Sequence, residues 1–151
     1  MQVFKVNDIN FKNSLTPKIL SDLNDYFDIE MKKRIISNLS KDIYFALQDN
    51  YGFQGFISLL DNDNFLEIDG IGVFKNFHRQ KAGQGLIKAS IDYAKINKKK
   101  GIIIKIKDDS SKDINYLKTR RFFTKMGFNN LTVINSTDYL NPCLVMIYII
   151  K

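Results

Sequence analysis

Residues 67–87 combine a strand pattern, a basic loop and the start of a helix in one continuous segment. The strand part reads Glu-Ile-Asp-Gly-Ile-Gly-Val, and the period of two along a strand places the carboxylates of Glu67 and Asp69 on one face. Residues 78–85 are basic and rich in small side chains, and residues 86–94 place apolar residues at helical spacing. A helix N-terminus offers unpaired N–H groups and the positive end of the helix dipole. This order therefore predicts a backbone cradle for an anion.

Length and composition indicate one folding unit. The 151 residues are 44% hydrophobic, which is enough for a compact core, and no linker-like or low-complexity stretch divides them. We therefore expect one domain spanning residues 1–151. The first residues lack the basic and then apolar layout of a signal peptide, and the apolar run at residues 144–150 is far too short to cross a bilayer. These features predict a soluble, cytoplasmic protein that does not enter membranes.

The residue types that usually build redox and metal sites are scarce. Cys143 is the one cysteine and His78 the one histidine, so no internal disulfide and no metal site are expected. The formal net charge of +7 is spread along the chain, with only Lys98, Lys99 and Lys100 in a run. Aromatic residues do not alternate with basic ones as they do in a nucleic-acid groove. We therefore expect no nucleic-acid partner, although the positive field suits an anionic small ligand.

The periodicity predicts strands and helices in the order β, α, α, β, β, β, α, β, α, β, β. Strands are expected at residues 2–6, 43–48, 53–60, 65–73, 102–106, 131–135 and 144–150. Helices are expected from a Thr16-Pro17 start onward, at residues 29–39, from Gly83 onward, and at residues 115–126. Turn-rich loops join the three middle strands and predict an antiparallel meander, and the following helix predicts a right-handed parallel crossover. The predicted fold class is a mixed α/β sheet.

Three glycine motifs compete for the basic loop. A P-loop needs Gly-Lys followed by Ser or Thr after four spacer residues, and the loop does not supply it. A dinucleotide fingerprint finds only Gly83 and Gly85, with Lys88 in the position of the third glycine. That fingerprint also expects its first glycine directly after the strand, whereas Gly83 comes ten positions after Val73.

The third motif is a resemblance. The strand, the loop and the pair Leu86-Ile87 together resemble the acetyl-CoA-binding core of the GNAT acyltransferases, whose motif is Gln/Arg-x-x-Gly-x-Gly/Ala. One register of this motif begins at Gln80 and keeps both glycines. The other begins at His78, keeps the family's spacing from the strand, and has Lys81 where the first glycine stands. We prefer the second register.

The resemblance implies a GNAT-like acyl-CoA N-acyltransferase fold, with acetyl-CoA as the cofactor, and it implies roles for the central strand. Glu67, six residues before Val73, matches the position where several GNAT enzymes carry a general base, and Asp69 is the alternative. Ile71, Gly72 and Val73 are expected to offer backbone groups to the pantetheine arm. The Val73 amide is expected to polarise the thioester carbonyl.

The resemblance also implies which groups hold the phosphates. Backbone N–H groups of the loop and of the helix start are expected to bind the pyrophosphate, with added charge from Arg79 or Lys81. The cofactor-binding residues in this segment are Arg79, Gln80, Lys81, Ala82, Gly83 and Gln84.

A second segment extends the resemblance. Residues 116–128 are similar to the late helix of the family, which ends Phe-Tyr-x-Lys-x-Gly-Phe. Phe123 stands where the family often has a tyrosine that protonates the departing thiolate. Tyr116 lies seven residues earlier, about two helical turns away, and shares a face with Phe123. We expect Tyr116 to contact the cofactor and to act as general acid; an ordinary packed aromatic with protonation by water is the alternative.

The expected function is transfer of the acetyl group of acetyl-CoA to a primary amine, by direct attack in a ternary complex. The acceptor is a small-molecule or peptide amine whose identity the sequence leaves open. The alternative is an acyl-CoA-binding sensor or interaction module with a degenerate GNAT site, which Lys81 and Phe123 favour and Glu67 and Asp69 oppose. Homodimers are common in the family, so a homodimer is also expected.

Overall fold

The computed structural model describes residues 1–78, 81–107, 114–135 and 142–151, and the statements below concern these residues. They form a seven-stranded sheet in the spatial order β1-β2-β3-β4-β5-β7-β6. The strands are β1 (Gln2–Val6), β2 (Ile43–Asp49), β3 (Gly52–Asn62), β4 (Phe65–Val73), β5 (Gly101–Lys107), β6 (Asn129–Ile134) and β7 (Cys143–Ile149). The helices are α1 (Ile9–Asp22), α2 (Ile29–Asn38), α3 (Ala82–Ile96) and α4 (Ile114–Lys125), with a short 3-10 turn, η1 (Lys75–Phe77).

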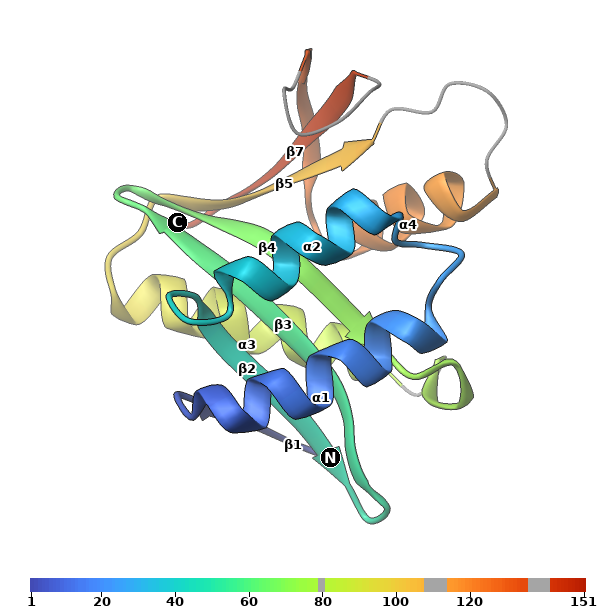
Figure 1. Cartoon of the computed structure of the whole chain (residues 1–151). Helices are drawn as coiled ribbons and strands as arrows, with labels where there is room; N and C mark the ends of the chain where they lie inside the picture. Colours follow the sequence, from blue (N-terminus) through green and yellow to red (C-terminus); the bar gives the residue numbers. More distant parts are fainter. Residues whose placement is uncertain (79–80, 108–113, 136–141) are drawn as a thin grey trace.

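The helices cover both faces of the sheet. Helices α1 and α2 lie across one face, α3 lies across the other, and α4 lies beside β5 and β7 (Figure 1). Within the described residues, no helix is both long enough and apolar enough to cross a bilayer.

The predicted meander and crossover are both confirmed. β2, β3 and β4 pair antiparallel in sequence order. β4 and β5 then pair in parallel, with α3 forming the connection between them. That parallel ladder is short, because it runs only from Phe65 opposite Gly101 to Ile68 opposite Ile104. The predicted mixed α/β fold class is therefore correct.

The predicted start of the first helix at Thr16-Pro17 is wrong. The helix α1 begins at Ile9, because the Asp8 side chain caps it by accepting from the Asn10 amide at 2.9 Å. Pro17 lies inside the helix, and the Thr16 hydroxyl bonds the Tyr44 hydroxyl at 2.8 Å instead of acting as a cap. The first turn, Ile-Asn-Phe-Lys at residues 9–12, alternates apolar and polar residues and so shows no helical period.

A β-bulge interrupts the pairing of β3 with β4. Ser58 lies opposite Gly70 and Leu59 lies opposite Ile68, so Asp69 is the extra residue on β4. A bulge places two successive residues on the same side, and both Asp69 and Gly70 contact α2. The bulge therefore aims the Asp69 side chain at a helix.

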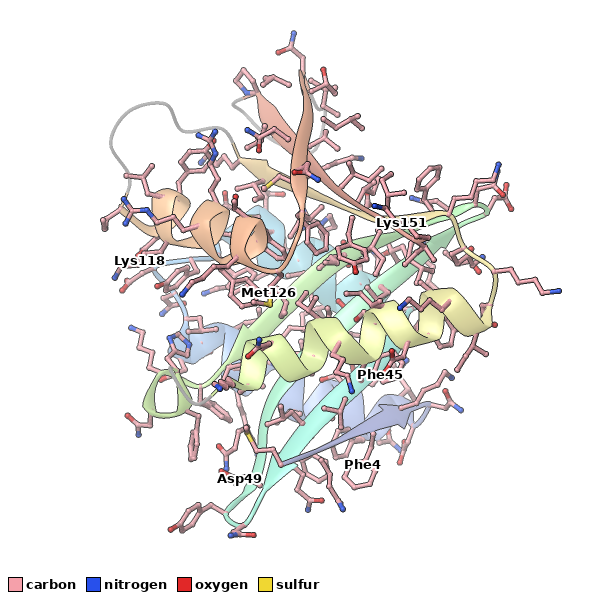
Figure 2. All side chains as sticks on the ribbon, turned by 180° about the vertical axis from the view of Figure 1, so that it is seen from behind. Phe4, Phe45, Asp49, Lys118, Met126 and Lys151 are labelled. Carbon is pink, nitrogen blue, oxygen red and sulfur yellow. The ribbon has the colours of Figure 1, made fainter. Side chains whose placement is uncertain are left out.

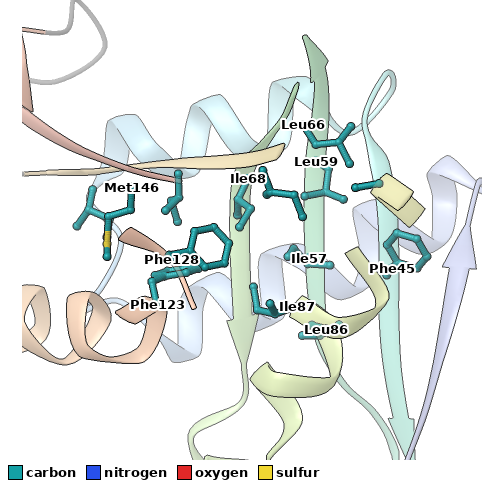
Figure 3. Close-up of a cluster of buried hydrophobic side chains, with 14 of the residues drawn as sticks. Phe45, Ile57, Leu59, Leu66, Ile68, Leu86, Ile87, Phe123, Phe128 and Met146 are labelled. Carbon is teal, nitrogen blue, oxygen red and sulfur yellow. The ribbon is translucent and has the colours of Figure 1, made fainter. Parts of the chain in front are cut away.

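Each face of the sheet carries its own hydrophobic cluster. On the α3 face, side chains of the central strands pack against Leu86 and Ile87 of α3 and against Phe123 and Phe128, as Figure 3 shows. Phe45 of β2 lies on this side too, behind α3 when the molecule is seen from the back (Figure 2). The opposite cluster joins α1 and α2 to the sheet.

Glycines of β4 allow α1 and α2 to approach the sheet closely. A Cβ atom at Gly70 would lie 2.9 Å from Ile35 Cδ1, and one at Gly72 would lie 2.8 Å from Ile19 Cγ2. An added Cβ atom at either position would force the facing isoleucine side chain to shift, so glycine here allows the two helices to pack closely on the strand. The strand that carries the candidate site is thereby fixed against both helices.

A buried polar cluster joins α1 to the start of β2. Lys12 Nζ lies 2.8 Å from Asp42 Oδ1 and 3.0 Å from the Leu39 carbonyl oxygen. Burial raises the pKa of Asp42 to about 6, against the opposing effect of Lys12. Burial also raises the pKa of Tyr44, which bonds Thr16 in the same cluster.

Candidate active site

A cleft of about 660 Å³ opens where β4 and β5 separate. The two strands pair no further than Ile68 and Ile104, and Figure 1 shows them diverging beyond that point. The cleft runs between the ends of β4 and β5, the connection from α1 to α2, the start of α3 and one side of α4. The backbone of β4 after the bulge therefore borders this space instead of a neighbouring strand.

The direction of the β4 backbone groups follows from its pairing with β3. The Phe74 amide donates to the Gln54 carbonyl at 2.9 Å. Because backbone groups alternate sides along an antiparallel strand, Gly72 also faces β3, whereas Ile71 and Val73 face the cleft. Of the three residues predicted to bind pantetheine, two therefore direct backbone groups into the cleft.

His78 fixes the end of β4. Its Nε2 lies 2.6 Å from the Val73 carbonyl oxygen, so the imidazole donates to that oxygen in the tautomer with a proton on Nε2. This contact leaves the Val73 amide as the group that faces the cleft. His78 also lines the cleft, and its ring is hydrogen-bonded to the backbone of Val73.

The start of α3 forms one end of the cleft. Lys81, Ala82, Gly83 and Gln84 all line it. The first helical bond is made by the Gly85 amide, which donates to the Lys81 carbonyl at 3.1 Å. The amides of the first turn precede this bond and have no helical partner. Four of the six predicted phosphate-binding residues thus meet at one helix N-terminus; the other two, Arg79 and Gln80, lie outside the described residues.

Lys81 adopts the backbone conformation of a glycine. Its φ of 61° and ψ of 19° are left-handed, and it is the residue directly before α3. An L-residue in this region costs about 1–2 kcal/mol relative to its usual conformations. The conformation agrees with the motif register in which Lys81 stands in place of a glycine.

α4 approaches the start of α3 from across the cleft. A Cβ atom at Gly83 would lie 3.1 Å from Phe122 Cζ, which is tighter than ordinary contact. Lys118 and Met126, labelled in Figure 2, lie near the two ends of this helix and line the cleft, as does Lys125. Together with Lys81, the two α4 lysines give this end of the cleft a positive lining.

Asp69 is held by α2. Its side chain is 2% exposed, with Oδ1 lying 3.0 Å from Arg34 Nε and Oδ2 accepting from Asn38 Nδ2 at 3.1 Å. Arg34 also donates through a terminal nitrogen to the Asp69 carbonyl oxygen at 3.1 Å. Both carboxylate oxygens are therefore occupied by the same helix.

Glu67 is held by the neighbouring strand. Its Oε1 lies 3.1 Å from Lys105 Nζ, and the two side chains are 16% and 31% exposed. Lys105 lines the cleft and is the first β5 residue beyond the end of the parallel ladder. The Lys105 ammonium thus stands at the fork of the two strands, next to the carboxylate that was predicted to be the base.

Tyr116 lies in the first turns of α4 and lines the cleft. Phe123, two turns later, is 1% exposed and packs edge to face against Phe122 and Phe128. The position that often carries a tyrosine in the family is therefore part of the core here. Tyr116, by contrast, is partly buried against the core and borders the cleft.

The connection from α1 to α2 closes one side of the cleft. The Asp25 carbonyl oxygen accepts from Asn115 Nδ2 of α4 at 3.0 Å, and the Asp25 carboxylate lies 3.5 Å from Lys75 Nζ of η1. Asp22 accepts from the Lys75 amide at 2.8 Å. This connection therefore touches elements on both sides of the opening.

Sequence reasoning missed the partners of both carboxylates. Arg34 and Asn38 come from a helix whose polar positions read as an ordinary solvated face. Lys105 did carry a signal, because it interrupts the apolar run Ile102-Ile103-Ile104-Lys105-Ile106. Within the described residues, no group of three or more His, Cys, Asp or Glu residues is placed to hold a metal ion.

Comparisons with known proteins agree with this geometry. The family model described as "Acetyltransferase (GNAT) family" matches residues 11–128. No curated protein matches the sequence significantly.

Solved structures share the fold at low identity. The ribosomal-protein-S18-alanine N-acetyltransferase from Escherichia coli is 16% identical with a TM-score of 0.72, covering 99% of this chain and 94% of that one. A GNAT-family acetyltransferase from Staphylococcus aureus Mu50 is 18% identical with a TM-score of 0.74, covering 99% of each chain. An aminoglycoside 6'-N-acetyltransferase complexed with coenzyme A is 13% identical with a TM-score of 0.74, covering 100% and 98%. Because the family model spans most of its length, the chain belongs to the GNAT family of acetyltransferases.

Proposed function

We propose that this protein transfers the acetyl group of acetyl-CoA to a primary amine. One observation carries the proposal: the cleft between β4 and β5 connects the α3 N-terminus with Lys105, the partner of Glu67, although Glu67 is not itself a lining residue. Acetyl transfer from a nucleotide thioester to an amine uses an anion-binding end for the cofactor and a carboxylate that can take the proton of the acceptor amine.

The described residues fit acetyl-CoA as the cofactor. The first-turn amides of α3 can bind the pyrophosphate, and Lys81 and Lys118 add positive charge at that end. The backbone groups of Ile71 and Val73 can hold the pantetheine arm as a missing strand would be held. Acetyl-CoA supplies an acetyl group activated as a thioester. A structural relative complexed with coenzyme A supports this assignment.

Each step of the transfer has a candidate residue. Glu67 removes the proton from the acceptor amine, and the neutral nitrogen attacks the thioester carbonyl directly. The Val73 amide donates a hydrogen bond to the carbonyl oxygen as negative charge develops there. Tyr116 gives its proton to the departing sulfur.

Asp69 is the weaker candidate for the base. Asp69 lines the cleft, but both of its oxygens are bound by α2, through an ion pair and a hydrogen bond, whereas Glu67 pairs through one oxygen with Lys105. We assign it the role of holding the β4 bulge against α2. The placement of the neighbouring backbone amides depends on this bulge.

A direct test is an acetyl-CoA turnover assay over a broad panel of amines, including amino acids, peptide N-termini, polyamines and aminoglycosides. Release of free coenzyme A together with an acetylated amine supports the proposal. The matched control is Glu67→Gln, which should bind acetyl-CoA as tightly as the natural protein but turn it over slowly. Tight acetyl-CoA binding without turnover on any amine would instead support a sensor.

A further inference from the structure

The Lys105 side chain occupies the place that the proposed mechanism reserves for an acceptor amine. Its Nζ lies 3.1 Å from Glu67 Oε1, within reach for proton transfer. Lys107, on the same face of β5, also lines the cleft, but it lies one pleat further from the fork, and its Nζ is 3.9 Å from the Asp28 carboxylate at the start of α2. Of these two lysines, Lys105 therefore has the shorter contact with a carboxylate and lies nearer to the end of the parallel ladder.

The charged groups that α2 contributes near the Glu67–Lys105 pair have other partners. On α2, Arg34 is engaged with Asp69, and at the α2 N-terminus Asp28 faces Lys107. The residues opposite Lys105 on β7 and next to it on β5 are apolar. The described charged group that pairs with Lys105 is thus Glu67.

The fork also limits how far a thioester can enter. β4 and β5 are hydrogen-bonded up to Ile68 and Ile104, so the pantetheine path between them ends at that pair. Lys105 is the next residue after Ile104 and projects from the face that carries Glu67. An acetyl group at the inner end of the cleft therefore arrives next to the Lys105 amine.

We propose that Lys105 is a self-acetylation site of this protein. The step rests on the proposed function, because it uses acetyl-CoA in the cleft and Glu67 as the base. The first proton moves from the Lys105 ammonium to Glu67, and the neutral nitrogen forms a bond to the thioester carbonyl carbon. As the carbon–sulfur bond breaks, the second proton passes from that nitrogen to the departing sulfur, so coenzyme A leaves as the thiol and Lys105 becomes an uncharged amide. Glu67 then releases its proton to solvent. The product has no ammonium to pair with Glu67, so the carboxylate becomes available to an external amine.

The test is to incubate the full chain with acetyl-CoA carrying a ¹³C-labelled acetyl group and to map the label by mass spectrometry. Cleavage before aspartates releases residues 92–107, a peptide that contains Lys105, Lys107 and the exposed Lys98. Lys98 is the internal reference for uncatalysed acetylation, because it is exposed and does not line the cleft. Label on Lys105 should exceed label on Lys98 by about 10²-fold, the usual contribution of a general base. The rate per molecule should not change with protein concentration.

Two variants separate the inference from its alternatives. Glu67→Gln should lower the rate of Lys105 labelling by about 10²-fold. Lys105→Arg keeps the positive charge and should remove the label at that position while leaving the labelling of Lys98 unchanged. Equal labelling of Lys105 and Lys98, or labelling that survives Glu67→Gln, overturns the inference. If free amines are acetylated and Lys105 stays unlabelled, the inference is wrong and the proposed function stands. If Lys105 is labelled and no free amine is acetylated, the inference stands and the proposed transfer to an external amine is wrong.

Discussion

The guanidinium of Arg34 and the carboxylate of Asp69 form an ion pair, with Nε 3.0 Å from Oδ1, that joins α2 to the bulge of β4. The Asp69 side chain is almost fully buried, and Asn38 binds its second oxygen. The pair therefore links helix α2 to the strand that forms one wall of the cleft.

Arg34→Met should lower the free energy of unfolding by about 3 kcal/mol, because it leaves a buried carboxylate without its cation. Urea denaturation measures the change. The double variant Arg34→Met with Asp69→Asn should recover part of the loss, since the buried group is then neutral. A single variant as stable as the natural protein would show that the ion pair does not stabilise the fold.

Glu67 and Asp69 should differ in their effect on catalysis. We expect Glu67→Gln to lower kcat by about 10²-fold with little change in the KM for acetyl-CoA, because it removes the base and leaves the cleft intact. Asp69→Asn should mainly lower the melting temperature. Steady-state kinetics of the two variants, together with thermal unfolding, test this division. The opposite pattern would make Asp69 the base.

Tyr116→Phe tests the general acid. We expect kcat to fall about tenfold, since the hydroxyl is lost and a thiol with a pKa of roughly 8.5 still departs with help from water. The control is Tyr93→Phe, at an α3 tyrosine that packs edge to face on Phe45 and does not line the cleft. An unchanged kcat in Tyr116→Phe would exclude the acid role.

Lys81→Gly should relieve the left-handed backbone before α3. We expect unfolding to become harder by about 1 kcal/mol, relative to Lys81→Met, which also removes the charge but keeps the Cβ atom. Chemical denaturation of both variants measures the difference. Lys98, with a φ of 57° away from the cleft, gives the control pair Lys98→Gly and Lys98→Met. If Lys81→Gly is no more stable than Lys81→Met, the backbone of Lys81 is not strained.

The buried carboxyl of Asp42 should make stability depend on pH. Its pKa is raised by burial from 3.8 to about 6, so the folded protein binds more protons than the unfolded chain between these values. The stabilisation from this group is full below pH 4 and is lost as the pH rises through 6. A shift of this size corresponds to a loss of about 3 kcal/mol. Unfolding curves from pH 4 to 7 should show this loss relative to Asp42→Asn, and parallel curves would refute it.

Local patterns predicted most of the fold because each of them reflects a local physical cause. Period-two apolar residues and turn-rich loops indicated the meander. Gly127, with a φ of 96°, follows the end of α4 as the predicted glycine cap. The start of α1 was missed because its first turn, Ile9 to Lys12, alternates apolar and polar residues, and the buried residue of that turn is the charged Lys12. A helical period therefore does not show at these positions.

The sequence by itself determined the order of the elements, the carboxylates on the central strand and the helix start that borders the cleft, because each depends on residues close together in the chain. Tertiary structure decided what those carboxylates contact. The partners of Glu67 and Asp69 are Lys105 and Arg34, which come from another strand and from a helix on the sheet face. A bulge that changes the direction of one side chain, and a ladder that ends at Ile68 and Ile104, set these pairs. Such contacts depend on how distant segments pack, and no local pattern of residues encodes them.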